Sequence, residues 1–275
     1  MGSSNRRRAI CEVIFSYNEA LIKLINVQSI FFSLIADLSY RTLELPAVKN
    51  KNVSCVAFQI LGTLIKRFNH ALIFPVRILQ ILENHEMSVC AIASGLLLLH
   101  DDFGITTILS VFIKEMLDHL SIDASDNQAS KHFAMFITEL GSLNPSLMIP
   151  HISTMSEEIL SLESYTLRNC ILNLMGEIII SELTSEDLSE ELKETRNDFL
   201  EDLLSHMQDV SAHVRSKVVQ IWNHMRKENS VPLTWQHRVL EVAVERLEDK
   251  SNLVRKNAII LVKSFLEHNP FSAKV

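Results

Sequence analysis

Two stretches near the C-terminus, Asp209-Val-Ser-Ala-His-Val-Arg215 and Asp249-Lys-Ser-Asn-Leu-Val-Arg255, decide the fold. They repeat the same Asp, Ser, Val and Arg at a spacing of 40 residues. In both, the third, sixth, seventh and tenth residues after the Arg are apolar, a spacing that gathers them on one side of a helix. Ser211 and Ser251 each precede the Arg by four residues, where a side chain can cap a first helical turn. The stretches therefore predict two equivalent, capped amphipathic helices.

The same pattern recurs toward the N-terminus and predicts four more such helices, each recognised by one marker residue. The six marker residues are Ser54, Cys90, Lys131, Arg168, Arg215 and Arg255. They are separated by 36, 41, 37, 47 and 40 residues. Amphipathic partner helices are expected before them at residues 30–43, 74–82, 105–120, 147–160, 199–207 and 233–247. An additional helix near residues 10–25 would belong to an incomplete first unit within residues 1–50.

A two-helix unit of roughly 40 residues is typical of HEAT and armadillo repeats. Such a unit has more apolar surface than it can bury alone, so neighbouring units stack into a continuous core. The composition agrees, because 47% of the residues are hydrophobic and only 6 Gly and 6 Pro occur in 275 residues. The sequence thus predicts an all-α fold, an α-solenoid of about six HEAT-type helix pairs, forming a single domain over residues 1–275.

Cysteines and apolar runs bear on the compartment. The four cysteines, Cys11, Cys55, Cys90 and Cys170, are scattered without a Cys-x-x-Cys pair, which favours free thiols in a reducing compartment. Glu12 interrupts the only apolar run that resembles a signal peptide, and the longest apolar run, at residues 89–99, is shorter than a membrane-spanning helix needs. We therefore expect an intracellular protein that does not enter a membrane.

Charge is distributed unevenly along the chain. The formal net charge is −7, yet residues 214–275 contain 11 Lys or Arg against 6 Asp or Glu. Residues 182–202 contain nine acidic and two basic residues, in the widest step between repeats. We interpret that acidic segment as a long helix with a solvated face, capped by Thr184 or Ser185. A docking or phosphorylation segment is the alternative.

Catalytic and ligand motifs are missing from the sequence. It contains no phosphate-binding Gly-rich loop, no dinucleotide fingerprint and no His-Glu-x-x-His. The 11 histidines are spread along the chain, and Asp101 with Asp102 beside Gly104 is explained by a turn. The sequence predicts no enzyme, no cofactor, no metal site and no small-molecule substrate. A helical enzyme assembled from residues far apart in sequence is the alternative from a different class.

Two groups of polar residues are candidates for a structural or binding role. Asp209 with Arg215, and Asp249 with Arg255, resemble the Asp and Arg ladder that joins adjacent HEAT units, with ligand binding as the alternative. Five further residues lie off the apolar faces of their helices and are candidates for a surface that contacts DNA or a partner. They are Lys217, His224, Lys227, Lys256 and Lys263. An ordinary solvated helix face is the alternative for this second group.

Several stretches carry a resemblance to a known family. They are Arg246-Leu-Glu-Asp-Lys-Ser-Asn-Leu-Val-Arg-Lys-Asn-Ala-Ile259 with Phe265-Leu-Glu-His-Asn-Pro-Phe271, and upstream Tyr165-Thr-Leu-Arg-Asn-Cys-Ile-Leu172 and Phe199-Leu-Glu-Asp-Leu-Leu204. In this order they resemble the condensin complex subunit 1 family, the HEAT-repeat subunit of condensin I, over residues 160–271. Members of that family are several times longer, so the sequence is expected to be an internal fragment.

The resemblance implies a non-ATPase scaffold subunit of the condensin complex that acts in mitotic chromosome condensation. It implies a kleisin subunit and SMC ATPase subunits as partners, and weak, non-specific contact with DNA or chromatin. It also implies a location in the nucleus and on chromosomes, and in the cytoplasm outside mitosis. The alternatives are another HEAT scaffold, such as a nuclear-transport or phosphatase adaptor, or the condensin II counterpart.

Overall fold

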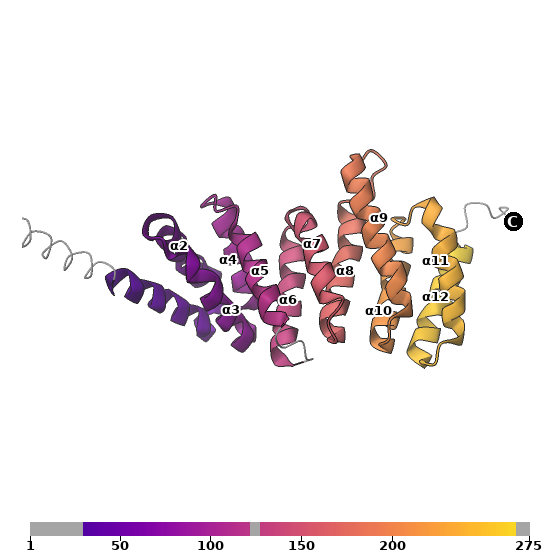
Figure 1. Cartoon of the computed structure of the whole chain (residues 1–275), viewed down its shortest axis with the longest axis horizontal. Helices are drawn as coiled ribbons and strands as arrows, with labels where there is room; N and C mark the ends of the chain where they lie inside the picture. The colour runs from indigo at the N-terminus through magenta and orange to yellow at the C-terminus, as the bar shows by residue number, and fades with distance from the viewer. Residues whose placement is uncertain (1–29, 122–126, 268–275) are drawn as a thin grey trace, which may run out of the picture.

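The computed structural model describes residues 30–121 and 127–267, and every regular element within these ranges is a helix. The long helices are, in chain order, 30–44, α2 (Lys51–Phe68), α3 (Phe74–Asn84), α4 (Val89–Asp101), α5 (Ile108–Leu120), α6 (Gln128–Leu143), α7 (Pro145–Ile159), α8 (Tyr165–Ser181), α9 (Glu190–Ser205), α10 (Ala212–Lys227), α11 (Leu233–Glu245) and α12 (Asn252–Glu267). Short 3-10 helices lie between them: η1 (Pro46–Lys49), η2 (His70–Leu72), η3 (Glu86–Ser88), η4 (His206–Gln208) and η5 (Arg246–Glu248). Figure 1 shows the helices standing side by side in one extended row.

The helices alternate between two layers, as the repeat pattern predicts. One layer contains the even-numbered helices, each of which packs against the next: α2, α4, α6, α8, α10 and α12. All six marker residues lie on these helices, at or near their first turns. The other layer contains 30–44, α3, α5, α7, α9 and α11, and apart from α9 these helices lie within a few residues of their predicted ranges. The predicted all-α solenoid of helix pairs is confirmed, and the predicted helix near residues 10–25 lies outside the described residues.

Capping residues start several of the even-numbered helices. The side chains of three residues at the predicted positions accept a bond from an amide of the first turn: Asn50, Asn127 and Ser164. Ser211 occupies the same place before α10, but its side chain accepts no capping bond. Instead, Asp209 Oδ1 accepts the Ser211 amide at 2.7 Å, and Asp249 Oδ1 accepts the Ser251 amide at 2.8 Å. The Asp two residues upstream thus fixes these turns, which corrects the predicted role of Ser211.

Packing between neighbouring even-numbered helices repeats at fixed positions. The sixth residue after the marker is buried on five helices: Leu96, Ile137, Leu174, Ile221 and Leu261. The equivalent residue of α2, Ile60, is 36% exposed, because the described residues place no even-layer helix before α2. Glycine allows the closest approaches, since a Cβ on Gly95 would lie 2.3 Å from the ring of Phe58. A continuous core therefore runs through the row and ends in an exposed apolar edge at α2.

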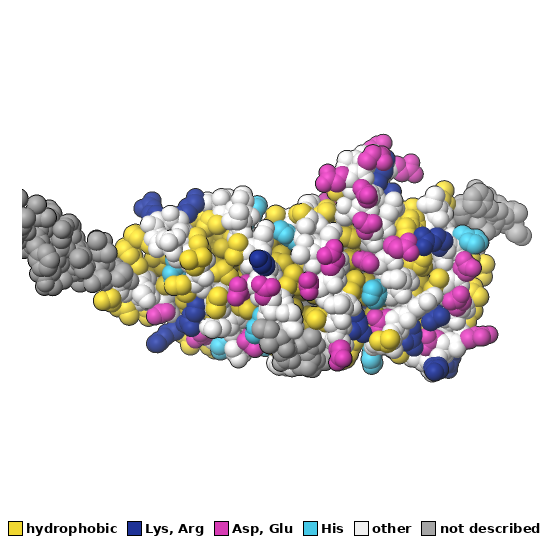
Figure 2. Space-filling view, viewed as in Figure 1, with side chains coloured by type: hydrophobic (Ala, Val, Ile, Leu, Met, Phe, Trp, Pro, Cys, Tyr) yellow, Lys and Arg dark blue, Asp and Glu magenta, His cyan; other side chains and the backbone are white. Residues whose placement is uncertain are grey.

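The acidic segment 182–202 is organised differently from the prediction. The helix α9 begins at Glu190, where the Ser189 side chain accepts the Leu192 amide at 3.3 Å. Thr184 Oγ1 instead donates to the Ile179 and Ile180 carbonyls, so it closes the end of α8. The predicted cap at Thr184 or Ser185 is therefore wrong. The predicted solvated acidic face is present, because acidic side chains gather over the projecting end of α9 (Figure 2).

Candidate functional site

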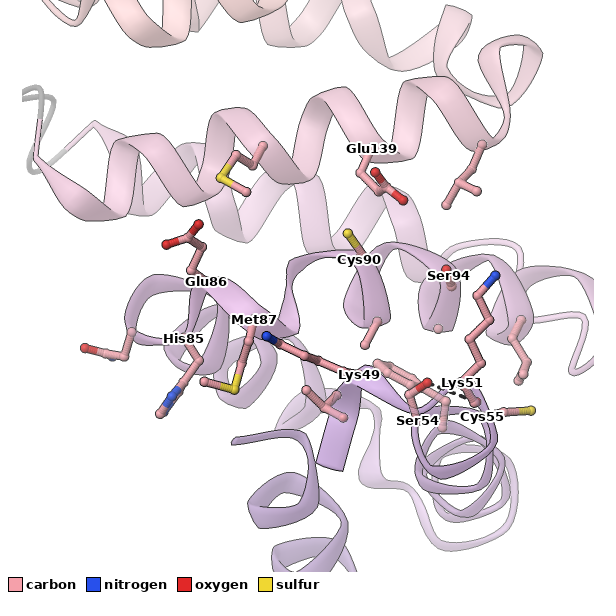
Figure 3. Close-up of a pocket in the computed structure, with 18 residues that line it drawn as sticks. Lys49, Lys51, Ser54, Cys55, His85, Glu86, Met87, Cys90, Ser94 and Glu139 are labelled. Carbon is pink, nitrogen blue, oxygen red and sulfur yellow. Dashed lines mark hydrogen bonds between the residues drawn. The ribbon is translucent and has the colours of Figure 1, made fainter. Parts of the chain in front are cut away.

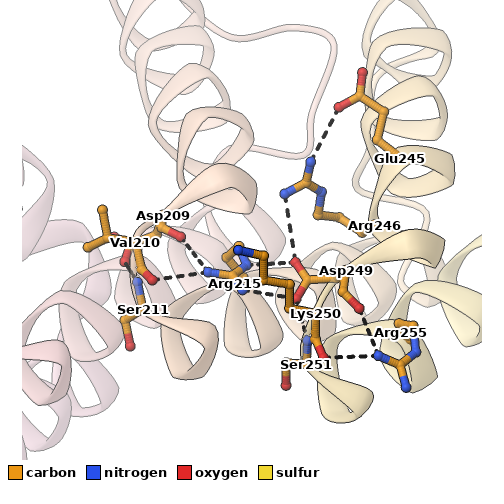
Figure 4. A network of polar contacts seen from close by, with 10 residues as sticks. All are labelled: Asp209, Val210, Ser211, Arg215, Glu245, Arg246, Asp249, Lys250, Ser251 and Arg255. Carbon is orange, nitrogen blue, oxygen red and sulfur yellow. Dashed lines mark hydrogen bonds and ion pairs between the residues drawn. The ribbon is translucent and has the colours of Figure 1, made fainter.

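The clearest polar network joins successive repeats at the starts of α10 and α12. Arg215 binds Asp249 through two parallel bonds, Nε to Oδ2 at 2.8 Å and Nη2 to Oδ1 at 2.9 Å (Figure 4). Only 13% of the Arg215 side chain and 4% of the Asp249 side chain are exposed. A planar guanidinium that meets a carboxylate in this way forms a strong bond and fixes the orientation of both groups.

The same residues also hold their own loops. Arg215 Nη1 donates to the Asp209 carbonyl at 2.7 Å, and Arg255 Nη1 donates to the Asp249 carbonyl at 2.8 Å. The hydrogen bond from Arg215 is the main cause that holds the pKa of Asp249 below its ordinary value, and the Ser251 amide adds to it. The bond to Asp249 likewise raises the pKa of Arg215. Both groups are therefore charged at neutral pH.

A third arginine extends this network toward the N-terminus. Arg168 at the start of α8 pairs with Asp209, with Nε to Oδ2 and Nη2 to Oδ1 both at 3.1 Å, and both side chains are 6% exposed. Arg168 also donates to the Leu162 carbonyl. The arginine of one repeat thus binds the aspartate of the next. The pattern of an Asp six residues before the Arg missed Arg168, because Leu162 occupies that place.

The structure therefore brings the four predicted ladder residues into two kinds of contact. Arg215 and Asp249 bind each other, while Asp209 binds Arg168, which the sequence analysis did not assign. Arg255 donates to the Asp249 and Lys250 carbonyls of its own loop. Within the described ranges, no carboxylate from a further repeat binds Arg255. These contacts join successive repeats and hold the loops that precede α10 and α12.

Three of the five candidate partner-facing residues lie on α10. His224 Nε2 lies 4.0 Å from Glu177 Oε1 of α8, and Lys217 precedes His224 by seven residues, or about two helical turns. Both residues are therefore on the side of α10 that faces the preceding helix. Lys227 is exposed at the last residue of α10. These three side chains border one surface over α8 and α10.

Lys256 and Lys263 lie elsewhere, on the side of α12 away from α10. Ser216, which is equivalent to Lys256, is covered by Asn257 of the next helix, whose Nδ2 lies 2.8 Å from Ser216 Oγ. Gly176, which is equivalent to Lys263, also faces the next helix, because its Cβ would lie 2.4 Å from Ile221. The two lysines thus lie on the side of α12 that corresponds to the side of α8 and α10 facing the next helix. The five predicted residues do not form one surface.

A groove that the sequence analysis did not predict lies between α2, α4 and α6 (Figure 3). Its volume is about 970 Å³. The middle helix, α4, contributes mainly small residues: Cys90, Ala91, Ser94 and Gly95. The neighbouring helices contribute larger ones, among them Phe58, Met135, Glu139 and Leu143. Because small side chains of α4 lie between larger ones of α2 and α6, the surface is hollowed over α4. The four small residues on one side of α4 are the only feature of the sequence that indicates this groove.

One side chain in this groove, the Cys90 thiol, could in principle react. Burial, and then the nearby carboxylate of Glu139, raise the pKa of Cys90, so its thiol is protonated at neutral pH and is a poor nucleophile. Within the described residues, no group of three or more His, Cys, Asp or Glu is arranged to hold a metal ion. Over those same ranges, no helix has the length and hydropathy required to cross a bilayer.

Known proteins resemble this chain over most of its length. The protein-family model described as "Sister chromatid cohesion protein PDS5 protein" matches residues 23–275. Condensin complex subunit 1 of Xenopus laevis is 35% identical over 253 residues, and that of Homo sapiens is 34% identical over 253 residues, each match covering 90% of this chain. The same subunit of Schizosaccharomyces pombe is 26% identical over 252 residues, or 89% of this chain. The chain spans 18%, 18% and 21% of these three relatives.

Proposed function

Because the chain belongs to the family described as sister chromatid cohesion protein PDS5 protein and is homologous to condensin complex subunit 1, we propose that it is a non-catalytic scaffold of a condensin complex. The observation that carries the proposal is the 35% identity with condensin complex subunit 1 of Xenopus laevis over 90% of this chain. The continuous row of helix pairs supports it, since stacked repeats provide an extended surface for several partners. ATP-driven chemistry would belong to other subunits.

The proposed partners are a kleisin subunit, the SMC ATPase subunits and DNA. The proposed role implies a location in the nucleus and on chromosomes, and in the cytoplasm outside mitosis. The test is co-elution of the full chain with purified kleisin and SMC subunits in size-exclusion chromatography. A stable complex supports the scaffold role, whereas separate elution of a folded chain contradicts it. A HEAT adaptor of the nuclear-transport or phosphatase type, used in place of this chain, is the control.

For DNA we propose the surface of α10 that contains Lys217, His224 and Lys227. Cations that displace counterions from phosphates bind duplex DNA with steep salt dependence and without sequence preference. Lys256 and Lys263 remain candidates for partner contact, but the equivalent positions on α10 and α8 face the next helix of the row, which favours a protein contact over DNA.

Two matched variants separate these surfaces in a fluorescence-anisotropy titration of short duplex DNA at low and high salt. Lys217→Glu with Lys227→Glu should abolish binding, while Lys256→Glu with Lys263→Glu should leave it nearly unchanged. With two phosphate contacts, the logarithm of the binding constant should fall with the logarithm of the salt concentration with a slope of about −2. Equal loss in both variants would contradict the assignment to α10. If the native chain binds no DNA at low salt, DNA contact is excluded, while the scaffold role is still decided by co-elution.

A further inference from the structure

The groove between α2, α4 and α6 is a departure from the regular packing of the even-numbered helices. The fourth residue after the marker is fully buried on α8 and α10, at Leu172 and Val219. On α4 and α6 the equivalent residues, Ser94 and Met135, are exposed, Met135 by 43%. The row thus opens over α4, where neighbouring side chains do not meet above the small residues.

The length of the groove suits a short helical segment. Its α4 residues run from Cys90 to Leu98, about 12 Å along the axis, and side chains i and i+7 of a helix are about 10.5 Å apart. On α6 the lining residues Met135, Glu139 and Leu143 are spaced by one turn each. The lining helices bond their backbone groups internally and offer no strand edge, so recognition depends on side chains. A helix lying along the groove is the geometry that uses them.

The apolar part of the lining is exposed and adaptable. Met87, Met135 and Leu143, which all line the groove, are 39%, 43% and 46% exposed. Methionine side chains adjust to the shape of an apolar partner, which makes them frequent in grooves that bind helices. Covering these side chains would remove apolar surface from water and supply the main driving force for binding.

The two sides of the groove carry opposite charges. Lys49 and Lys51 approach it from η1 and the start of α2, whereas Glu139 points into it from α6 and Glu86 lines it from η3 (Figure 3). A bound helix would therefore meet cations along one flank and a carboxylate along the other. Complementary charges on an interface rim set orientation and partner choice more than affinity.

We propose that this groove binds an amphipathic helix of a partner protein, with apolar residues at positions i, i+4 and i+7. Acidic residues on that helix face Lys49 and Lys51, and basic residues on its opposite flank face Glu139. The inference rests on the proposed scaffold role, because it names the chemistry of one partner segment. It assigns the groove to a protein ligand and keeps it separate from the DNA surface of α10.

The test uses the full chain and two synthetic peptides of about 14 residues, which is about 21 Å of helix. Both carry Leu at positions i, i+4 and i+7. The matched peptide has Glu on the flank expected at Lys49 and Lys51 and Lys on the flank expected at Glu139, and the reversed peptide has these charges exchanged. Fluorescence anisotropy of labelled peptide measures affinity, with a circular-dichroism spectrum of each protein variant as the folding control.

The matched peptide should bind about tenfold more tightly than the reversed one. Ser94→Trp, which fills the groove from an exposed position, should abolish binding, whereas Gln220→Trp on an exposed position of α10 should not. Lys51→Glu combined with Glu139→Lys should reverse the preference between peptides. Equal affinities, undiminished binding by Ser94→Trp, or no binding by the folded chain would overturn the proposal.

Two other occupants give distinct results. If light scattering shows a dimer that Ser94→Trp dissociates, the groove is an interface between copies of this chain, and the proposal is wrong. If removal of residues 1–29 is required before the matched peptide binds, a segment of the chain itself occupies the groove, and the proposal is also wrong. Failure to co-elute with condensin subunits would instead count against the scaffold role, because the peptide experiment involves this chain alone.

Discussion

Replacement of Asp249 by Ala should destabilise the protein far more than its single negative charge suggests. The substitution removes both bonds from Arg215, the bond from the Ser251 amide, and the ion pair with Arg246 Nη1 at 3.8 Å. It leaves a guanidinium with 13% exposure beside a cavity. A donor that is buried without its acceptor loses its hydration and gains nothing in return.

The loss of stability in Asp249→Ala depends on how well water can hydrate the Arg215 guanidinium that remains. Loss of one partner from a buried ion pair costs about 3–5 kcal/mol. Arg215 keeps its bonds to the Asp209 and Val210 carbonyls at 2.7 and 3.1 Å, so we expect the lower end of that range, about 3 kcal/mol. Such a loss is a large part of the roughly 5–15 kcal/mol that stabilises a typical domain.

A second pair with the same chemistry provides the control. Arg238 binds Glu201 with bonds of 2.8 and 3.0 Å, but these side chains are 48% and 57% exposed. Glu201→Ala should therefore cost at most about 1 kcal/mol. Both variants lose an arginine–carboxylate pair, but Asp249→Ala also loses the Ser251 amide bond and the Arg246 ion pair. The difference between the variants therefore reports burial together with these two further contacts.

The assay is urea unfolding followed by far-UV circular dichroism and by tryptophan fluorescence. Trp222 in α10 and Trp235 in α11 are the only two tryptophans, so fluorescence reports the repeats that contain the network, while circular dichroism reports all helices. If the repeats unfold in separate steps, the fluorescence transition of Asp249→Ala shifts more than the circular-dichroism transition. Equal costs for Asp249→Ala and Glu201→Ala in both signals would refute the reasoning.

Three further outcomes are expected from the same structure. Ile137→Ala should cost about 3 kcal/mol in urea unfolding, whereas Ile60→Ala, at the equivalent but exposed position of α2, should cost less than about 1 kcal/mol. Gly95→Ala should lower the midpoint of thermal unfolding, because the core ring of Phe58 stands 2.3 Å from the new methyl group and overpacking of about 1–3 kcal/mol exceeds the gain in helix propensity. The pKa of Asp249 in the folded protein lies below its ordinary value of 3.8. The stability that ionised Asp249 contributes is therefore complete above pH 3.8 and is lost as the pH falls through the folded pKa. In acid unfolding, the stabilities of wild type and Asp249→Ala should therefore converge at low pH.

The sequence predicted those parts of the fold that repeat. Apolar spacing located the six even-numbered helices, because the same buried positions recur at every marker residue. The start of α9 was mispredicted, since Thr184 can cap a following helix or close a preceding one, and only the carbonyls of α8 decide between them. Arg168 was missed because its aspartate comes from the following repeat and not from six residues upstream. The four small residues of α4 do not predict the groove by themselves, because the groove forms only where α2, α4 and α6 lie side by side.

The basic charge of residues 214–275 overstates how much of that region can contact DNA. The five arginines of α10, α11, η5 and α12 all make contacts within the chain: Arg215, Arg226, Arg238, Arg246 and Arg255. Lys263 also lies 3.5 Å from Glu267, although that pair is well exposed. On α10 only Lys217 and Lys227 then remain as cations for phosphates, and two contacts give weak, salt-sensitive binding. The proposed groove for a protein helix and the proposed DNA surface of α10 lie on one row of helices. Engagement of both at once would give a higher affinity than either surface alone.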